Sequence, residues 1–309
     1  KYLQNTRNKT AQASLSRYAW ISIAAALATI ALKSTAYLLT GSVGLLSDAI
    51  ESLVNLVGAV MALAMLTIAS EPEDEEHAFG HSKAEYFSSG VEGTLIMLAA
   101  ISIAVTAIHR LWHPQPLEKI SLGVAVSVAA SAINGSVAVI LQRAAVRFES
   151  ITLKADAQHL LTDVWTSAGV LAAIGLVALT HWTWLDPLIA LAVAANISRI
   201  GGRIVRESIQ GLMDTALPTG EVATIRAILD SYAEQGIGFH ALRTRQAGSR
   251  RFVYFHIQAP GGWTIHHGHS ILEKIESDIR QALRNVTIWS HLESLDDPRS
   301  FQDQYLDRY

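Results

Sequence analysis

Long runs of apolar residues, interrupted by short polar breaks, fill the first two thirds of the chain. The runs cover residues 18–39, 44–69, 87–111, 120–142, 152–180 and 184–208. Each is close to or above the roughly 20 residues that a helix needs to cross a hydrocarbon core about 30 Å thick. Turn-forming or polar residues such as Thr40-Gly41-Ser42 and Glu71-Pro72 separate them. The pattern therefore predicts six transmembrane helices.

The pattern of polar and apolar positions changes after about residue 215. It predicts an amphipathic helix over 221–235, strands over 239–246 and 251–258, a helix over 265–283 and a strand over 286–293. In the second strand, Val253, Phe255 and Ile257 fall on one face, as in a half-buried strand. We thus expect an α-helical membrane protein with a six-helix transmembrane domain (1–214), a C-terminal α+β domain of order α-β-β-α-β (215–295) and a flexible tail (296–309).

Composition supports this division and excludes several classes of protein. Of the 309 residues, 17% are charged, against about 25% in typical soluble domains. Six buried helices of a soluble protein would need more surface charge than this. The chain has no cysteine, which excludes disulfides, thiolate metal sites and thiol catalysis. Its net charge of −3 provides no basic field for nucleic acid.

Basic residues are concentrated on one side of the predicted membrane domain. They lie before the first run, between the fourth and fifth runs, and at the end of the sixth run, whereas the opposite side has only Arg110 and Lys119. Loops rich in Lys and Arg stay in the cytoplasm. Both termini are therefore predicted to be cytoplasmic.

The second and fifth runs share a polar pattern with the spacing i, i+3 and i+7, which places three side chains on one helical face. The residues are Asp48, Glu51 and Asn55 in the second run, and Asp156, His159 and Asp163 in the fifth. If the two faces oppose each other, the last two residues of each triplet form a set of nitrogen and oxygen ligands for a divalent cation. Asp48 and Asp156 would support them from a second layer.

Hydrogen bonding between helices is the alternative explanation, and for Asn55 alone it is equally reasonable. It accounts poorly for the whole set, because each ionisable group inside a bilayer costs about 2.5–3.5 kcal/mol on insertion scales. A bound or transported cation therefore explains the pattern better. The predicted transport site is Glu51, Asn55, His159 and Asp163.

Four short motifs follow one another along the chain: Asp48–Asn55, His77–Glu85 with the sequence HAFGHSKAE, His159–Asp163 and Leu242–Gly248. Together they resemble the motifs of the cation diffusion facilitator family, in its bacterial zinc and ferrous-iron efflux branch. The resemblance implies a homodimeric metal–proton antiporter of the inner (plasma) membrane, not an enzyme. It also implies six helices per protomer and a cytoplasmic domain with a metallochaperone-like (ferredoxin-like) fold. The chain departs from the family at Glu51 and Asn55, where an Asp or His, and then an Asp, are usual.

The resemblance implies three further groups of functional residues. It places a loop metal site at Asp74, His77 and His81, where a solvated acidic loop is the plainer interpretation. It places a binuclear cytoplasmic metal site that stabilises the dimer at His240, His256, His269, His291 and Glu293, although a lone histidine is usually an ordinary surface or core residue. It pairs Lys83 with Asp214 as a charge interlock, whereas both are otherwise simply solvated.

The predicted function is export of a divalent cation from the cytoplasm in exchange for protons, by alternating access. Zinc is the first candidate because the histidine-rich sites suit it, with Fe2+, Mn2+, Cd2+, Co2+ and Ni2+ as alternatives. His159 would carry the proton, since a free imidazole has a pKa of about 6.5. A metal sensor without transport and a passive channel are alternative functions. An intramembrane metalloenzyme is disfavoured, because the chain has no His-Glu-x-x-His motif.

Overall fold

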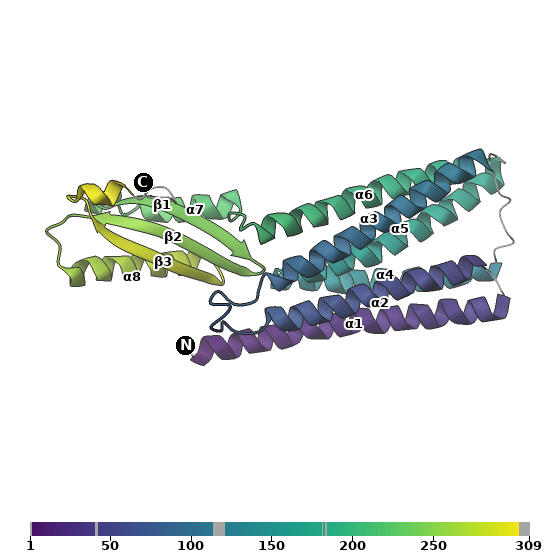
Figure 1. Cartoon of the computed structure of the whole chain (residues 1–309), viewed down its shortest axis with the longest axis horizontal. Coiled ribbons are helices and arrows are strands. Elements are labelled where there is room, and N and C mark those ends of the chain that lie inside the picture. Colours follow the sequence, from purple (N-terminus) through teal and green to yellow (C-terminus); the bar gives the residue numbers. More distant parts are fainter. Residues whose placement is uncertain (1, 41–42, 114–120, 181, 183, 303–309) are drawn as a thin grey trace. The chain divides into compact units, whose positions relative to one another are not determined.

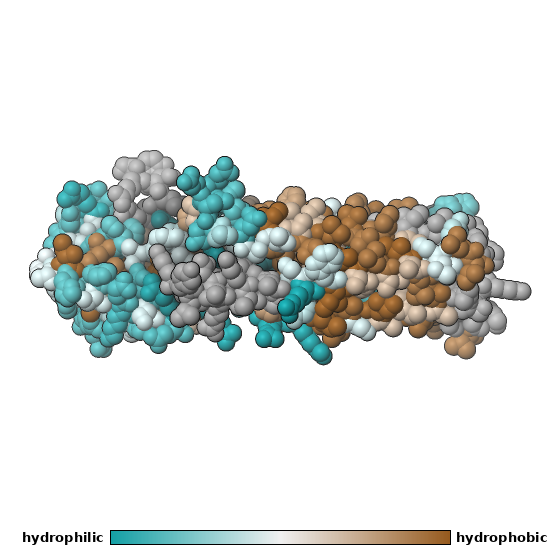
Figure 2. Space-filling view, turned by 90° about the horizontal axis from the view of Figure 1, so that it is seen from below, coloured by the Kyte–Doolittle hydropathy of each residue, from teal (hydrophilic) through white to brown (hydrophobic). Residues whose placement is uncertain are grey.

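The chain folds into two compact units, Lys1–Ile209 and Gln210–Tyr309. The computed structural model describes residues 2–40, 43–113, 121–180, 182 and 184–302. The first unit contains only helices among these residues, and the second combines helices with a sheet. Figure 2 shows the same contrast in chemistry, because apolar side chains cover the helical unit and hydrophilic ones cover much of the C-terminal unit.

Six long helices run alongside one another in the first unit (Figure 1). Their bounds are α1 Tyr2–Thr40, α2 Val43–Ala69, α3 Ala84–Trp112, α4 Ser121–Phe148, α5 Ile151–Thr180 and α6 Leu185–Leu212. Each predicted apolar run lies within one of these helices, apart from residue 120 and residue 184 at two starts. The largest difference is in α1, which begins 16 residues before the predicted start at residue 18. This extension is mostly polar, so the pattern of apolar residues does not indicate it.

Four helices of the described chain are long and apolar enough to cross a membrane. They lie at Leu15–Leu39, Ala84–Trp112, Val124–Phe148 and Leu185–Leu212. Among the described side chains of α2, the stretch Asn55–Ala69 is also apolar. The first half of α2 carries the polar residues Asp48, Glu51 and Asn55 that predict a cation site.

Small residues let α3 and α6 approach each other closely. A methyl group added to Gly93 would meet the backbone nitrogen of Val205 at 3.0 Å, and one added to Gly201 would meet the carbonyl oxygen of Gly93 at 3.0 Å. One turn or two away, Ser208 Oγ donates a hydrogen bond to the carbonyl oxygen of Tyr86 at 2.5 Å. Close contact between backbones at small residues is a common way for membrane helices to associate.

The C-terminal unit is a three-stranded sheet with helices on one face (Figure 1). Its elements are α7 Thr219–Asp230, η1 Ala233–Gln235, β1 Gly238–Ala247, β2 Arg250–Ala259, α8 Ile265–Ala282, β3 Val286–Ser294 and η2 Pro298–Phe301. The sheet order is β1-β2-β3, with β1 antiparallel and β3 parallel to the central strand. The order α-β-β-α-β predicted from the sequence is therefore confirmed.

The alternation along β2 determines which face of the sheet is covered. Val253, Phe255 and Ile257 are buried and pack in one cluster with residues of both helices, among them Ile225 of α7 and Ile275 of α8. Successive side chains of a strand point to opposite faces. Tyr254, His256 and Gln258 consequently lie on the other face of the sheet, opposite the cluster formed with α7 and α8.

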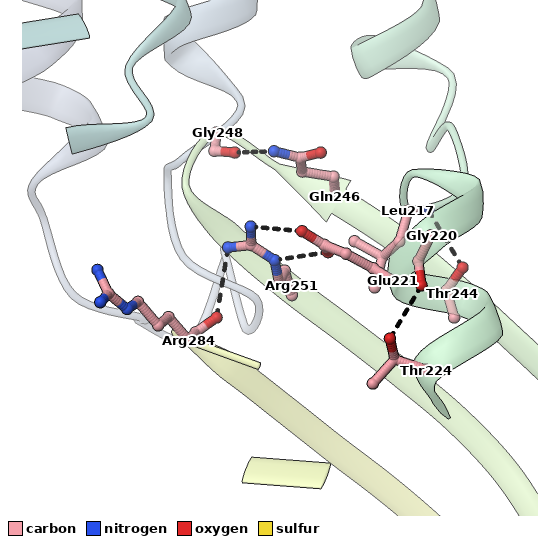
Figure 3. A network of polar contacts seen from close by, with 9 residues as sticks. All are labelled: Leu217, Gly220, Glu221, Thr224, Thr244, Gln246, Gly248, Arg251 and Arg284. Carbon is pink, nitrogen blue, oxygen red and sulfur yellow. Dashed lines mark hydrogen bonds and ion pairs between the residues drawn. The ribbon is translucent and has the colours of Figure 1, made fainter. Parts of the chain in front are cut away.

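A buried arginine fastens α7 to the edge of this core (Figure 3). Arg251 donates two hydrogen bonds to the Glu221 carboxylate, each 2.8 Å long, and a third to the carbonyl oxygen of Arg284 at 3.3 Å. Two parallel charge-assisted bonds hold a guanidinium in one orientation. Glu221 also lies in the first turn of α7, where the helix dipole favours a negative charge.

The last described residues pack back on the sheet. The predicted tail begins at residue 296, and its residues Pro298–Phe301 form η2. Ser300 is buried there, and its carbonyl oxygen accepts a hydrogen bond from Gln258 Nε2 at 3.1 Å. Residues 303–309 of the predicted tail lie outside the described residues.

Candidate metal centres

Asp163 is the centre of a buried polar group within the helical unit. Its Oδ2 accepts a hydrogen bond from Asn55 Nδ2 of α2 at 2.5 Å and another from Asn134 Nδ2 of α4 at 2.8 Å. All three side chains are buried. Because each amide turns its nitrogen to the carboxylate, its oxygen points away, and both amide oxygens lack a hydrogen-bond partner in the described chain. The group thus has two amide oxygens available as metal ligands inside the bundle.

His159 lies one turn from Asp163 on α5 and is also buried. Gly58 of α2 lies beside its ring, since a methyl group added there would be in van der Waals contact with His159 Nδ1 at 3.9 Å. The structure therefore places the predicted residues Asn55, His159 and Asp163 where α2 meets α5. The side chains of the other two predicted residues of α2, Asp48 and Glu51, lie outside the described residues.

Asp156 is buried two turns before Asp163 on the same helix. Ser22 of α1 donates a hydrogen bond to its Oδ1 at 2.9 Å, and its Oδ2 has no hydrogen-bond partner in the described chain. The predicted supporting position is thus held by α1, a helix that the sequence pattern did not connect with the site.

Asn134 is the residue that the sequence reasoning missed. It lies in the fourth apolar run, in the segment Ala132-Ile133-Asn134-Gly135. A lone amide in a membrane helix usually makes a helix–helix hydrogen bond, and Asn134 does so with Asp163. The available signal was an amide in a helix whose middle otherwise carries no strongly polar residue. Nothing in its spacing, however, indicates which helix it faces.

The three residues of the predicted loop site lie together between α2 and α3. Asp74 Oδ1 is 3.3 Å from His77 Nδ1, and Asp74 Oδ2 is 3.4 Å from His81 Nε2. Gly80 makes this approach possible, because its φ of 77° turns the chain between the two histidines. The backbone N–H of His77 donates to Asp74 and holds the pKa of that carboxyl below its usual range. One carboxylate and two imidazoles within 4.8 Å suit a divalent cation.

The register of the sheet builds the cytoplasmic group. His240, His256 and His291 stand side by side on β1, β2 and β3. His256 Nδ1 is 3.2 Å from both His240 Nε2 and Glu293 Oε1, and His240 Nε2 is 2.8 Å from Glu293 Oε2. His240, His256 and Glu293 are partly buried, and their ligand atoms lie within 4.8 Å of one another. Two imidazoles and a carboxylate fit a zinc ion, which would complete its coordination with a fourth ligand.

The two remaining predicted ligands lie further out. His291 Nε2 is 3.7 Å from Glu293 Oε1, and the histidine side chain is 63% exposed. His269 is on the exposed side of α8 and does not belong to the compact group of His240, His256 and Glu293 among the described residues. Their participation in a second metal position therefore stays a prediction.

Asp214 of the predicted charge interlock has a partner within its own unit. It follows α6 with a φ of 58°, a conformation that Asp tolerates better than most residues. Arg245 of β1 donates to its Oδ1 at 3.0 Å. Nearby, Leu217 N donates to Thr244 Oγ1 at 3.2 Å (Figure 3), so the segment after α6 is fixed to β1. The pairing of Asp214 with Lys83 stays a prediction.

The architecture defines a multi-pass membrane protein with a separate α+β unit, and comparison with known proteins identifies its family. Residues 19–213 match the cation efflux transmembrane domain, and residues 217–295 match the cation efflux protein cytoplasmic domain. The chain belongs to the cation diffusion facilitator family of cation efflux transporters. The resemblance seen in the sequence motifs is thereby confirmed.

Curated relatives match nearly the whole chain. An uncharacterized transporter of Synechocystis sp., sll1263, is 52% identical over 285 residues, which cover 92% of each chain. The cation-efflux pump FieF of Salmonella arizonae is 33% identical over 273 residues, 88% of this chain and 90% of the pump. The FieF of Shewanella oneidensis is 30% identical over 270 residues, 87% of this chain and 90% of the pump.

Proposed function

We propose that this protein exports a divalent metal ion, zinc first, from the cytoplasm in exchange for protons. The observation that carries the proposal is the buried group of Asn55, Asp163 and Asn134 beside His159, inside a bundle of membrane helices. A carboxylate, an imidazole and two unpartnered amide oxygens provide hard and borderline donors for such an ion. Glu51 would add a second carboxylate.

Metal and proton would compete for the same side chains. A metal ligand must be deprotonated, so binding of the ion releases protons and protonation releases the ion. In the proposal, the ion enters the site from the cytoplasm and protons from the opposite side displace it. Alternating access then needs the helices that carry the ligands to move relative to one another, with α2 and α5 spanning the membrane alongside the other four helices.

The proposed molecule is a homodimer in the inner (plasma) membrane with both termini in the cytoplasm. The basic residues before the first apolar run and at the end of the sixth support this orientation. The match of residues 217–295 to a cation efflux cytoplasmic domain supports the location of the C-terminal unit. In this dimer the group of His240, His256 and Glu293 would hold a resident zinc ion, whose chemistry is structural.

Purified protein in sealed vesicles tests the transport proposal. A metal-sensitive dye and a pH-sensitive dye inside the vesicles should report metal entry together with proton exit. Metal uptake that neither changes the internal pH nor responds to a pH gradient would favour a passive channel. Metal binding by folded protein without any uptake would favour a sensor.

A calorimetric titration of the same protein tests the choice of metal. We expect heat of binding with Zn2+, since imidazole ligands suit that ion. Clear heat with Mn2+ and none with Zn2+ would reverse the ranking, and it would follow from the neutral amide at Asn55 in place of a second anionic ligand.

A further inference from the structure

Glu92 of α3 is a buried carboxylate that the proposed transport site does not use. Its side chain is 0% exposed, and neither carboxylate oxygen has a hydrogen-bond partner in the described chain. An uncompensated charged group in an apolar interior is expensive. A buried carboxylate without a hydrogen-bond partner is stabilised either by a bound cation or by a proton.

Glu85, two turns earlier on the same helix, shows how this protein treats a structural carboxylate. It is also buried, but Ser150 Oγ donates a hydrogen bond to its Oε2 at 2.5 Å. Thr152 Oγ1 donates to its carbonyl oxygen at 3.2 Å. Glu85 therefore ties α3 to the start of α5, whereas Glu92 makes no comparable bond.

The surroundings of Glu92 connect it with the transport site. A methyl group on Gly58 would lie 3.9 Å from Glu92 Cγ and 3.9 Å from His159 Nδ1, so both side chains border the same point beside α2. On α5, Asp156 presents a second buried carboxylate oxygen without a hydrogen-bond partner in the described chain. The two helices pack together beside these carboxylates, because Ile96 of α3 and Ala155 of α5 belong to one buried cluster. Asp156 and His159 are three residues apart, a rise of about 4.5 Å along the helix.

We propose that Glu92 and Asp156 form a second position for the divalent cation, next to His159 and on the side of the transport site that faces the start of α5. The proposal rests on the proposed transport function and extends it. At this second position two carboxylates, those of Glu92 and Asp156, would bind the cation before or after it contacts Asp163. Hard oxygen donors of this kind bind divalent metal ions in general.

Transport kinetics in vesicles test the proposal with matched variants. Glu92→Gln keeps the shape and removes the charge, and we expect kcat/KM for the metal to fall by about tenfold or more. Glu92→Asp keeps the charge and should recover most of the loss. Glu85→Gln is the control, because it also neutralises a buried carboxylate of α3 and should change kcat/KM by less than about threefold.

A stability measurement separates a cation position from a structural role. Replacement of a buried, unpartnered polar group by an apolar one of similar shape is neutral or stabilising. Glu92→Met should therefore melt at the same or a higher temperature in metal-free detergent solution, and yet lose transport like Glu92→Gln. A structural carboxylate would instead show a lower melting temperature in both variants.

Three results would overturn the proposal: wild-type kinetics in Glu92→Gln, full transport by Glu92→Met, or failure of both variants to fold. Failure of the proposed transport function can be distinguished from failure of the second cation position. If vesicles with wild-type protein take up no metal, the proposed function fails, and metal-dependent stabilisation then tests whether Glu92 binds the cation. In that case the gain in melting temperature with Zn2+ should be smaller in Glu92→Gln than in Glu85→Gln, and equal gains would reject the second position.

Discussion

The two candidate metal groups, one in the sheet and one in the helical unit, are built in opposite ways. The cytoplasmic group takes its ligands from neighbouring strands, where the pairings His240–His256 and His256–His291 are fixed by the register of one sheet. The membrane group takes Asn55, Asn134 and Asp163 from three different helices. A sheet register cannot shift without breaking its ladder of hydrogen bonds, whereas packed helices can slide or rotate as units.

This difference suggests different residence times for the ion. In the sheet, His240, His256 and Glu293 already contact one another at 2.8–3.2 Å, so an ion would find its ligands in place. In the helices, two amides donate hydrogen bonds to the Asp163 carboxylate, and an ion would have to compete with them. A preformed group suits a resident ion, and a group that exchanges amide donors for a metal suits a transported one.

The largest expected effect is on transport, from removal of the carboxylate that the membrane group surrounds. Asp163→Ala should lower the rate of metal uptake by vesicles by about a hundredfold or more, because it deletes a ligand and leaves both amide nitrogens unpaired. Asp186→Asn is a matched control on α6, since Asp186 pairs with Arg110 at 3.1 Å away from this group. Equal rates for the wild type and Asp163→Ala would show that the ion takes another path.

A second change tests whether the amide at position 55 sets the metal preference. Asn55→Asp places a carboxylate where an amide now donates to Asp163 at 2.5 Å. Two facing carboxylates repel each other without an ion and attract a divalent cation strongly. We expect Zn2+ affinity to rise by about tenfold and the metal-free protein to melt at a lower temperature, both measured in detergent solution. An unchanged affinity would mean that residue 55 does not contact the ion.

The sequence predicted the sheet site and the membrane site with different completeness, and the reason is geometric. For the sheet site, alternation placed His256 opposite the apolar face of β2, and it placed His291 and Glu293 on one face of their strand. The grouping of these residues with His240 came from the family resemblance and not from periodicity. The i, i+3, i+7 pattern grouped Asn55 on α2 and His159 with Asp163 on α5. It could not reveal Asn134 or Ser22, because a single polar residue in an apolar helix has no period that relates it to another helix.

A smaller effect on transport is expected from the cytoplasmic group. Glu293→Gln removes the carboxylate that contacts His240 and His256. We expect the full-length protein to lose most of its Zn2+-dependent gain in melting temperature, while vesicle transport stays within about threefold of wild type. His266→Ala, on the exposed side of α8, is the control and should change neither quantity. A hundredfold loss of transport in Glu293→Gln would contradict the division between a resident and a transported ion.

The smallest expected effect is on the stability of the two helices, α7 and α8, that pack behind the sheet of the cytoplasmic group. Tyr232 is buried after α7, and its hydroxyl donates to Asp278 Oδ2 of α8 at 2.6 Å. Burial, together with this hydrogen bond, raises the pKa of Tyr232 to about 12 from its ordinary value of 10.0. The hydroxyl of Tyr232 therefore keeps its proton in the folded state at a pH where the same hydroxyl is deprotonated in the unfolded chain. Stability should fall between pH 10 and 12, by up to about 1.4 kcal/mol per pH unit.

Hydrogen exchange of α7 and α8 in the full-length protein can measure this loss, with Tyr232→Phe for comparison. The variant should be less stable by about 1 kcal/mol at neutral pH, since it lacks one hydrogen bond, and it should lose less stability above pH 10. If wild type and variant lose stability in parallel, the hydroxyl of Tyr232 does not hold the two helices together. The rigidity that distinguishes the sheet site from the membrane site would then depend on the apolar core and on other polar bonds, such as those of Arg251 to Glu221.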